Sequence, residues 1–197
     1  MAPLLRRAAS RQIRPRQVLL KTPVIEEWSP NGPRAEEDLR ELSAVLHAAV
    51  HAGASVSFVL PFSLDDAYTF WRAKVLPGVL DRSRVVLVAR IGDEIIGTVQ
   101  LILDTPANQK HRAEVAKLLV HPKARRRGIA RALMQAIEDV ARRERRTLIT
   151  LDTRTGDLAE PLYLSMGYVK VGIIPRYAVD PEGRKLEGTT ILYKELQ

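Results

Sequence analysis

The sequence predicts one α/β domain in which helices pack on a mixed sheet. Its 197 residues suffice for one well-buried domain and are few for two. The first third has apolar residues at helical spacing, and from Arg84 onwards β-branched runs alternate with helical stretches. Strands that alternate with helices in this way favour a layered α/β architecture.

The N-terminal 22 residues differ in composition from the rest of the chain. They hold six of the 31 lysines and arginines and no acidic residue, which leaves 25 cations against all 23 anions in residues 23–197. We therefore expect residues 1–22 to form a flexible basic tail and residues 23–197 to form the folded domain. The tail could be an organelle transit peptide, a disordered leader or an overextended start. Because the folded part is nearly neutral, no nucleic-acid partner is expected.

Two absences from the sequence narrow the chemistry. There is no cysteine, which excludes disulfides, thiolate nucleophiles and zinc ribbons. No apolar run approaches the roughly 20 residues of a membrane span, and the N-terminus lacks the apolar core of a secretory signal. A soluble, cytoplasmic protein without a membrane partner is expected.

Two helices are predicted in the first third of the chain. Apolar residues from Leu39 to Ala49 fall on one face of a helix over Ala35–Ala52, which Gly53 would end. Ser63 is a suitable N-cap for a second helix, which would end near residues 77 and 78.

Six strands and two further helices are predicted beyond these. Two β-branched strands joined at Gly92-Asp93 indicate a hairpin. The other strands are AEVAKLLV, TLITLD, YVKVGII and EGTTILYKEL, and GDLAEPLYLSM is a short helix. A helix of about 15 residues follows AEVAKLLV. Its expected buried stripe is Ile129, Leu133, Ile137 and Val140. The side chains expected to face water are Arg131, Gln135, Glu138 and Arg142.

The stretch VHPKARRRGIARAL, residues 120–133, combines positive charge with a helix start. The first N–H groups of a helix are unpaired and together carry about half a positive charge. Gly128 would let an anion approach the backbone, and Arg125, Arg126 and Arg127 raise the local potential, so a phosphate or pyrophosphate is expected here. A solvated basic loop that caps a surface helix is the alternative for this motif alone. The sequence lacks Walker and dinucleotide fingerprints.

The wider arrangement resembles the GNAT superfamily of acetyl-coenzyme A (acetyl-CoA) dependent N-acetyltransferases. In that family a glutamine or arginine, two residues, a glycine, one residue and then glycine or alanine bind the coenzyme's pyrophosphate. Arg125, Gly128 and Ala130 match this pattern, and LYLSMGY, residues 162–168, is similar to the family's second landmark. The resemblance covers roughly residues 84–194.

The resemblance implies a mostly antiparallel central sheet with helices on both faces. It also implies an acetyl-CoA-dependent N-acetyltransferase domain over residues 23–197, with acetyl-CoA as the donor. The residues expected to bind it are Leu118, Leu119, Val120, Arg125, Arg126, Arg127, Gly128, Ile129, Ala130, Arg131 and Tyr163. One departure is Gly156, where many relatives have asparagine, and Thr155 or Asp157 could substitute for it.

Acetyl transfer to an amine needs a neutral nucleophile and a protonated leaving group. An alkyl amine is mostly protonated at neutral pH, so a base is expected near it. Glu114 matches the family's glutamate base, and Asp152 could instead hold or deprotonate the amine; an ion pair and a helix cap are their structural alternatives. Tyr163 matches the tyrosine that protonates the departing thiolate, although it could also be core. Without cysteine, direct attack in a ternary complex is expected.

The predicted function is acetyl transfer to a primary amine of a small molecule, by a protein that could form a homodimer. Three stretches, residues 53–71, 97–128 and 151–168, are similar to the subgroup that includes tabtoxin-resistance acetyltransferases, which suggests a small acceptor. Protein lysines or N-termini are the alternative acceptors, and a non-catalytic acyl-CoA-binding module is the alternative class. The segments 55–71 and 174–188 are expected to form the acceptor pocket. His47 and His51 have a spacing that can bind metal, but no third ligand is evident and no metal is expected.

Overall fold

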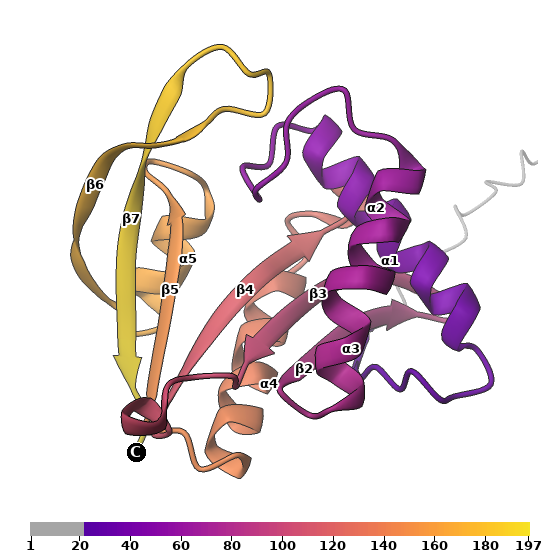
Figure 1. Cartoon of the computed structure of the whole chain (residues 1–197), viewed down its shortest axis with the longest axis horizontal. Helices are drawn as coiled ribbons and strands as arrows, with labels where there is room; N and C mark the ends of the chain where they lie inside the picture. The colour runs from indigo at the N-terminus through magenta and orange to yellow at the C-terminus, as the bar shows by residue number, and fades with distance from the viewer. Residues whose placement is uncertain (1–21) are drawn as a thin grey trace, which may run out of the picture.

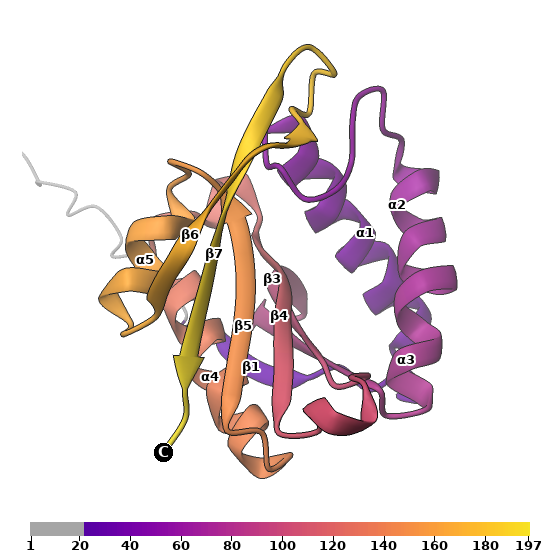
Figure 2. The same cartoon turned by 60° about the vertical axis from the view of Figure 1, so that its left-hand side comes forward.

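The structure, a computed structural model, describes residues 22–197 as one seven-stranded sheet with helices on both faces (Figures 1 and 2). The strands are β1 (Val24–Glu27), β2 (Arg84–Ile91), β3 (Glu94–Ile102), β4 (Arg112–Val120), β5 (Leu148–Arg154), β6 (Val169–Val179) and β7 (Leu186–Glu195). The helices are α1 (Ala35–His51), α2 (Leu64–Phe70), α3 (Leu76–Leu80), α4 (Ile129–Arg143) and α5 (Ala159–Ser165). The predicted basic tail lies outside the described residues except for its last residue.

The strand order is β1-β2-β3-β4-β5-β7-β6, and β4 with β5 is the one parallel pair within the described residues. This confirms the mixed, mostly antiparallel sheet and the hairpin at Gly92-Asp93. Parallel neighbours need a crossover connection, and here α4 supplies it. None of the helices described is long and apolar enough to span a membrane.

Two apolar layers hold the helices on the sheet. Side chains alternate between the faces of a strand, so Val86 and Val88 of β2 point to α1 and α2, whereas Val85 and Leu87 point to α4. Trp71 is fully buried in the layer between the sheet and helices α1 and α2. Figure 2 shows α1, α2 and α3 on one side of the sheet and α4 and α5 on the other.

The predicted face of α4 is correct except at one residue. The buried side chains include Ile129, Leu133, Ile137 and Val140, as expected. Glu138, expected to face water, is instead 5% exposed and its carboxylate accepts a hydrogen bond from Lys194 Nζ of β7 at 2.7 Å. The acidic residue type assigned Glu138 to the solvent face, because the sequence pattern does not show that a cation from a distant strand pairs with it.

The N-terminal third departs from the predictions in two places. The strand β1 was not predicted because it is four residues long and half of it is glutamate. The second helix begins as predicted, with Ser63 and Asp66 in a reciprocal capping box. It then continues through a π-helical turn, Trp71–Val75, into α3 and ends at Leu80 instead of near residues 77 and 78. Pro77 is tolerated because it lies in the first turn of α3, where its missing N–H costs little.

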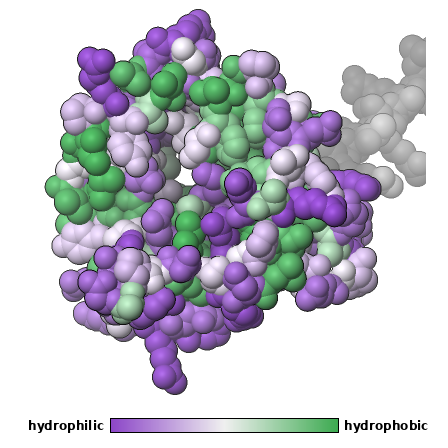
Figure 3. Space-filling view, viewed as in Figure 1, coloured by the Kyte–Doolittle hydropathy of each residue, from purple (hydrophilic) through white to green (hydrophobic). Residues whose placement is uncertain are grey.

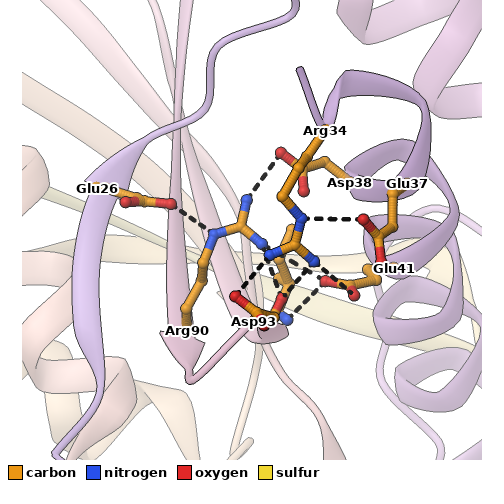
Figure 4. Close-up of polar contacts among 8 residues, drawn as sticks. Glu26, Arg34, Glu37, Asp38, Glu41, Arg90 and Asp93 are labelled. Atoms are coloured by element: carbon orange, nitrogen blue, oxygen red, sulfur yellow. Dashed lines mark hydrogen bonds and ion pairs between the residues drawn. The ribbon is translucent and has the colours of Figure 1, made fainter. Parts of the chain in front are cut away.

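A buried arginine joins β1, β2 and α1 at the end of the sheet remote from the β5–β7 strands (Figure 4). Arg90 of β2 forms ion pairs with Asp38 at 2.7 Å and Glu41 at 3.5 Å, and it also bonds Glu26 of β1. The side chains of Arg90 and Asp38 are only 11% and 7% exposed. Removal of one partner from such a buried pair leaves an uncompensated charge.

Replacement of Asp38 by alanine is expected to lower the free energy of unfolding by roughly 3 kcal/mol, because Arg90 loses its most buried partner. Glu37→Ala is the matched control: it removes an exposed carboxylate that pairs with Arg34 on the same helix, and it should cost less than about 1 kcal/mol. Urea unfolding of both variants measures the difference. Equal losses would show that the Arg90 pair contributes no more than a surface contact.

Candidate active site

The strands β4 and β5 separate after three residue pairs. Residues 112–114 pair in parallel with residues 148–150. Beyond them β4 continues beside β3 and β5 continues beside β7, and Figure 1 shows the two strands diverging. The edge of β4 that faces β5 therefore presents backbone N–H and C=O groups without a strand partner from residue 115 onwards.

A cleft of about 800 Å³ occupies the space between the separated strands. Figure 3 shows the hollow between the part of the molecule that carries β5, β6 and β7 and the part that carries β4 and α1. Its lining includes residues 115–120 of β4, the end of β5, the start of α4, and Leu162 and Tyr163 of α5. Residues 52–57 after α1 and the paired ends of β6 and β7 line the other side. Elements from both faces of the sheet thus meet at one opening.

The loop before α4 is shaped to present amides to this cleft. Arg126 has φ +63° and Gly128, the N-cap of α4, has φ +77°. A Cβ on Gly128 would meet no heavy atom within 4 Å, so the backbone conformation and not the space requires glycine. The first hydrogen bond of α4 runs from Ala132 N–H to Gly128 O at 3.0 Å, which leaves the N–H groups of residues 129–131 without a helical acceptor. Such a concave array of amides suits an anion.

Most of the predicted coenzyme-binding residues line the cleft. They are Leu118, Leu119, Val120, Arg125, Arg126, Gly128, Ile129, Ala130, Arg131 and Tyr163. Arg127 is exposed and is not among the lining residues. It lies between two residues with left-handed backbone conformations, Arg126 and Gly128. Gly156, at the position where many relatives have asparagine, also lines the cleft, and its N–H donates to Glu160.

Tyr163 and Asp152 enter the cleft from opposite faces of the sheet. Tyr163 of α5 is 5% exposed, and its ring lies 5.7 Å from that of Tyr168 in the layer under α4 and α5. Burial, with a smaller contribution from Asp157 and Asp152, raises the pKa of the Tyr163 phenol far above its ordinary value. The phenol therefore stays protonated and can donate at any physiological pH.

Asp152 of β5 lies on the α1 face, because its neighbour Leu151 packs under α4. The hydroxyl of Thr189 donates to its Oδ2 at 2.9 Å. Glu114 lies on the same face, at the last residue pair that joins β4 and β5, and is not among the lining residues. Its charge acts on Arg84: burial lowers the pKa of that guanidinium and Glu114 opposes the shift.

Sequence reasoning did not identify Lys117 as a site residue. Val99 of β3 opposes two residues of β4, which makes a β-bulge, and one of them is Lys117 with φ +50°. Its Nζ donates to Ser57 Oγ at 3.3 Å and lies 5.7 Å from the ring centroids of Phe58 and Phe70. A lysine within the apolar run AEVAKLLV was the available signal, but a bulge cannot be read from that run.

The two segments expected to form the acceptor pocket do contribute to the cleft. Residues 55–57 line it, as do Tyr177, Ala178 and residues 187–188. The aromatic residues of the first segment behave differently: Trp71 and Phe62 are buried in the layer between α1 and the sheet. His47 and His51 lie 4.1 Å apart between ring centroids, and His51 Nε2 bonds to Phe62 O. Within residues 22–197 no group of three metal-ligating side chains gathers.

The chain is similar in sequence to known acetyltransferases, which agrees with the site described above. Residues 42–168 match the model of the acetyltransferase (GNAT) family. The chain is 31% identical over 127 residues to an uncharacterized N-acetyltransferase of Azospirillum brasilense, encoded in the hisH-hisA intergenic region, a match that covers 63% of this chain and 73% of that protein.

Two solved structures share the fold. A protein described as an acetyltransferase from Salmonella typhimurium, with its cofactor acetyl-CoA, has a TM-score of 0.70 at 18% identity over 89% of this chain and 94% of that one. The ribosomal-protein-alanine N-acetyltransferase of Brucella melitensis has a TM-score of 0.69 at 20% identity over 88% and 99%. The family model spans well over half of the chain, so the protein belongs to the GNAT family and is an acetyl-CoA-dependent N-acetyltransferase.

Proposed function

We propose that the protein transfers an acetyl group from acetyl-CoA to a primary amine of a small molecule, by direct attack in a ternary complex. The observation that carries the proposal is the cleft between β4 and β5, which is lined from both faces of the sheet. The amide array and Tyr163 come from the α4 and α5 face, and Asp152 comes from the α1 face. Donor and acceptor would approach one another from opposite sides, with no covalent enzyme intermediate.

The loop before α4 would hold the coenzyme's pyrophosphate. The unpaired N–H groups of residues 129–131 and the positive end of α4 favour an anion there, and Arg125 and Arg126 add charge at the cleft lining. The free edge of β4 at residues 118–120 would bind the pantetheine arm as an added strand does. Its N–H groups would also polarise the thioester carbonyl.

The acceptor side supplies the groups that handle protons. Asp152, fixed by Thr189, would bind the ammonium of the acceptor and pass its proton to water. The neutral amine nitrogen then attacks the carbonyl carbon and the N–C bond forms. The nitrogen gives its second proton to Asp152, which has already passed the first to water, and the C–S bond breaks. The sulfur takes a proton from the Tyr163 hydroxyl, which regains one from solvent.

A hydrogen bond between the two segments that carry opposite walls of the cleft supports a small acceptor over a protein. Leu60 N–H, in the segment between α1 and α2, donates to Pro181 O in the turn between β6 and β7 at 2.7 Å. Figure 1 shows these two segments approaching one another above the separated strands. An extended polypeptide would have to displace this contact, whereas a small molecule would not. The sequence similarity to the tabtoxin-resistance subgroup agrees with this choice.

Calorimetric titration with acetyl-CoA, combined with a thiol-release assay over primary amines and over peptides with free lysines and N-termini, tests the proposal. We expect binding of acetyl-CoA and turnover of one class of small amine. Turnover of the peptides alone would assign a protein acceptor, and binding without any turnover would contradict the transfer itself.

Gly128→Ala is expected to weaken acetyl-CoA binding about tenfold or more, because left-handed alanine costs about 1–2 kcal/mol and the loop relaxes away from the conformation that aims its amides. Gly92→Ala is the matched control, since Gly92 has φ +64° in the hairpin between β2 and β3 and does not line the cleft. Calorimetry should give an unchanged dissociation constant for Gly92→Ala. Equal losses in both variants would indicate a general effect of destabilisation.

Tyr163→Phe is expected to lower kcat about 100-fold and to leave the affinity for acetyl-CoA within about twofold, because only proton donation is lost. Tyr168→Phe removes a hydroxyl from the adjacent buried ring, which does not line the cleft, and should leave kcat within about twofold. Steady-state thiol release with the best amine of the panel measures both. An unchanged kcat in Tyr163→Phe would remove the proposed donor.

Asp152→Asn is expected to lower kcat/KM for the amine about 100-fold, because the group that receives the ammonium and its proton is lost. Glu114→Gln should cost less than about tenfold, since Glu114 lies behind the cleft lining. Measurement of kcat/KM against pH for both variants separates the two carboxylates. A larger loss in Glu114→Gln, with a changed pH profile, would assign the base to Glu114 acting through water.

A further inference from the structure

We infer that the acceptor is an amino carboxylate, a small molecule that carries a carboxylate as well as the reacting amine. Its ammonium would lie at Asp152 on β5, and its carboxylate would bind Lys117 on β4, across the cleft. This inference rests on the proposed function and narrows its class of substrate.

The bulge in β4 is what brings Lys117 to the acceptor side. In a regular strand Lys117 would point to the same face as Val115, which packs under α4. Val99 opposes two residues at this position, so the alternation is interrupted and Lys117 points instead to Ser57, Phe58 and Phe70 beside α1 and α2. The chain thereby places a cation on the same face as Asp152.

Lys117 has no ion-pair partner within 4.0 Å among the described residues, and neither has Asp152. The contacts of the Lys117 ammonium are the hydroxyl of Ser57 and the rings of Phe58 and Phe70. Burial lowers the pKa of Lys117; the negative charges of Asp152 and Glu114 oppose this, and Arg84 adds to it. Asp152 is thus near enough to act on Lys117, although no ion pair within 4.0 Å joins the two side chains.

Other charges near Asp152 in the lining, those of Arg154, Asp157 and Glu187, are paired with one another. Arg154 contacts Asp157 and Glu187, each at 3.3 Å. A half-buried cation without a directly paired carboxylate is costly to hold, so the lack of an ion pair at Lys117 among the described residues indicates an anionic group of a ligand. The ordered rings of Phe58 and Phe70 hold its ammonium in place without neutralising it.

The backbone around Lys117 is strained on both sides of the contact. Ser57 has φ +76° and Lys117 has φ +50°, and their side chains are hydrogen bonded to one another. Left-handed residues other than glycine persist only where the surrounding structure enforces them, and they gather at functional sites. Two such residues facing one another in the cleft indicate that the position of the ammonium is under structural control.

The two charges lie at similar depth in the cleft. The last pair that joins the strands is Glu114 with Thr150. Asp152 comes two residues after this pair on β5, and Lys117 comes three residues after it on β4, one of them taken up by the bulge. A molecule that bridges them would carry both a cationic and an anionic group, as an amino carboxylate does.

The test uses the full-length protein and an acceptor panel of matched pairs. The panel holds free L- and D-amino acids, β-alanine and γ-aminobutyrate, each beside its carboxamide. We expect the best carboxylate to exceed its carboxamide about tenfold or more in kcat/KM, as befits a charge-assisted contact. Lys117→Met should reduce this preference to within about twofold, and Lys117→Arg should retain most of it.

Lys74→Met is the control, because Lys74 is an exposed lysine on the π-helical turn and does not line the cleft. The ratio of kcat/KM for the carboxylate to kcat/KM for the carboxamide should be the same in Lys74→Met as in the wild type. Far-ultraviolet circular dichroism, the melting temperature and the acetyl-CoA dissociation constant show whether Lys117→Met is folded. If it is not, the preference of Lys117→Arg and of the wild type decides the question.

The outcomes separate this inference from the proposed function. A protein that binds acetyl-CoA and acetylates carboxamides as well as carboxylates, or nothing in the panel, overturns the amino carboxylate. So does a preference that survives Lys117→Met. A protein that does not bind acetyl-CoA contradicts the proposed function itself, and does so before any acceptor is added.

Discussion

The separation of β4 from β5 is the constraint on which the rest of the structure depends. A parallel pair of strands requires a crossover, and α4 must therefore start where β4 ends. Because the strands have already diverged at that point, the positive end of the helix opens onto the space between them. The same divergence frees the edge of β4. The anion site and the unpaired strand edge thus both follow from the separation of β4 and β5.

Three of the six non-glycine residues with positive φ in the described part of the chain lie where this topology leaves room for ligands. Ser57, Lys117, Arg126 and Gly128 all line the cleft and all have left-handed backbone conformations. Two buried apolar layers hold the surrounding elements in place and can sustain this cost. The layers also supply the dry environment of Tyr163. Rigid packing and functional geometry are therefore coupled in this domain.

Much of the fold could be predicted because it follows from local patterns. The stripe on α4, the N-cap at Ser63 and the glycine hairpin are each set by neighbours in sequence. What failed depends on distant partners: β1 is a strand because β2 lies beside it, and Glu138 is buried because Lys194 reaches it. Within the site, Gly128 could be read from its residue type. Lys117 could not, because a register shift against β3 decides which way it points.

The contact between Leu60 and Pro181 has a thermodynamic consequence. The two walls of the cleft are joined at one end by this hydrogen bond and at the other end by the pairing of residues 112–114 with residues 148–150. Between these two connections the walls are separated by the cleft. Any molecule that touches both walls acts as a brace between the halves of the sheet. Since only the folded arrangement offers both walls at once, occupancy of the cleft and the melting temperature of the whole domain are coupled by mass action.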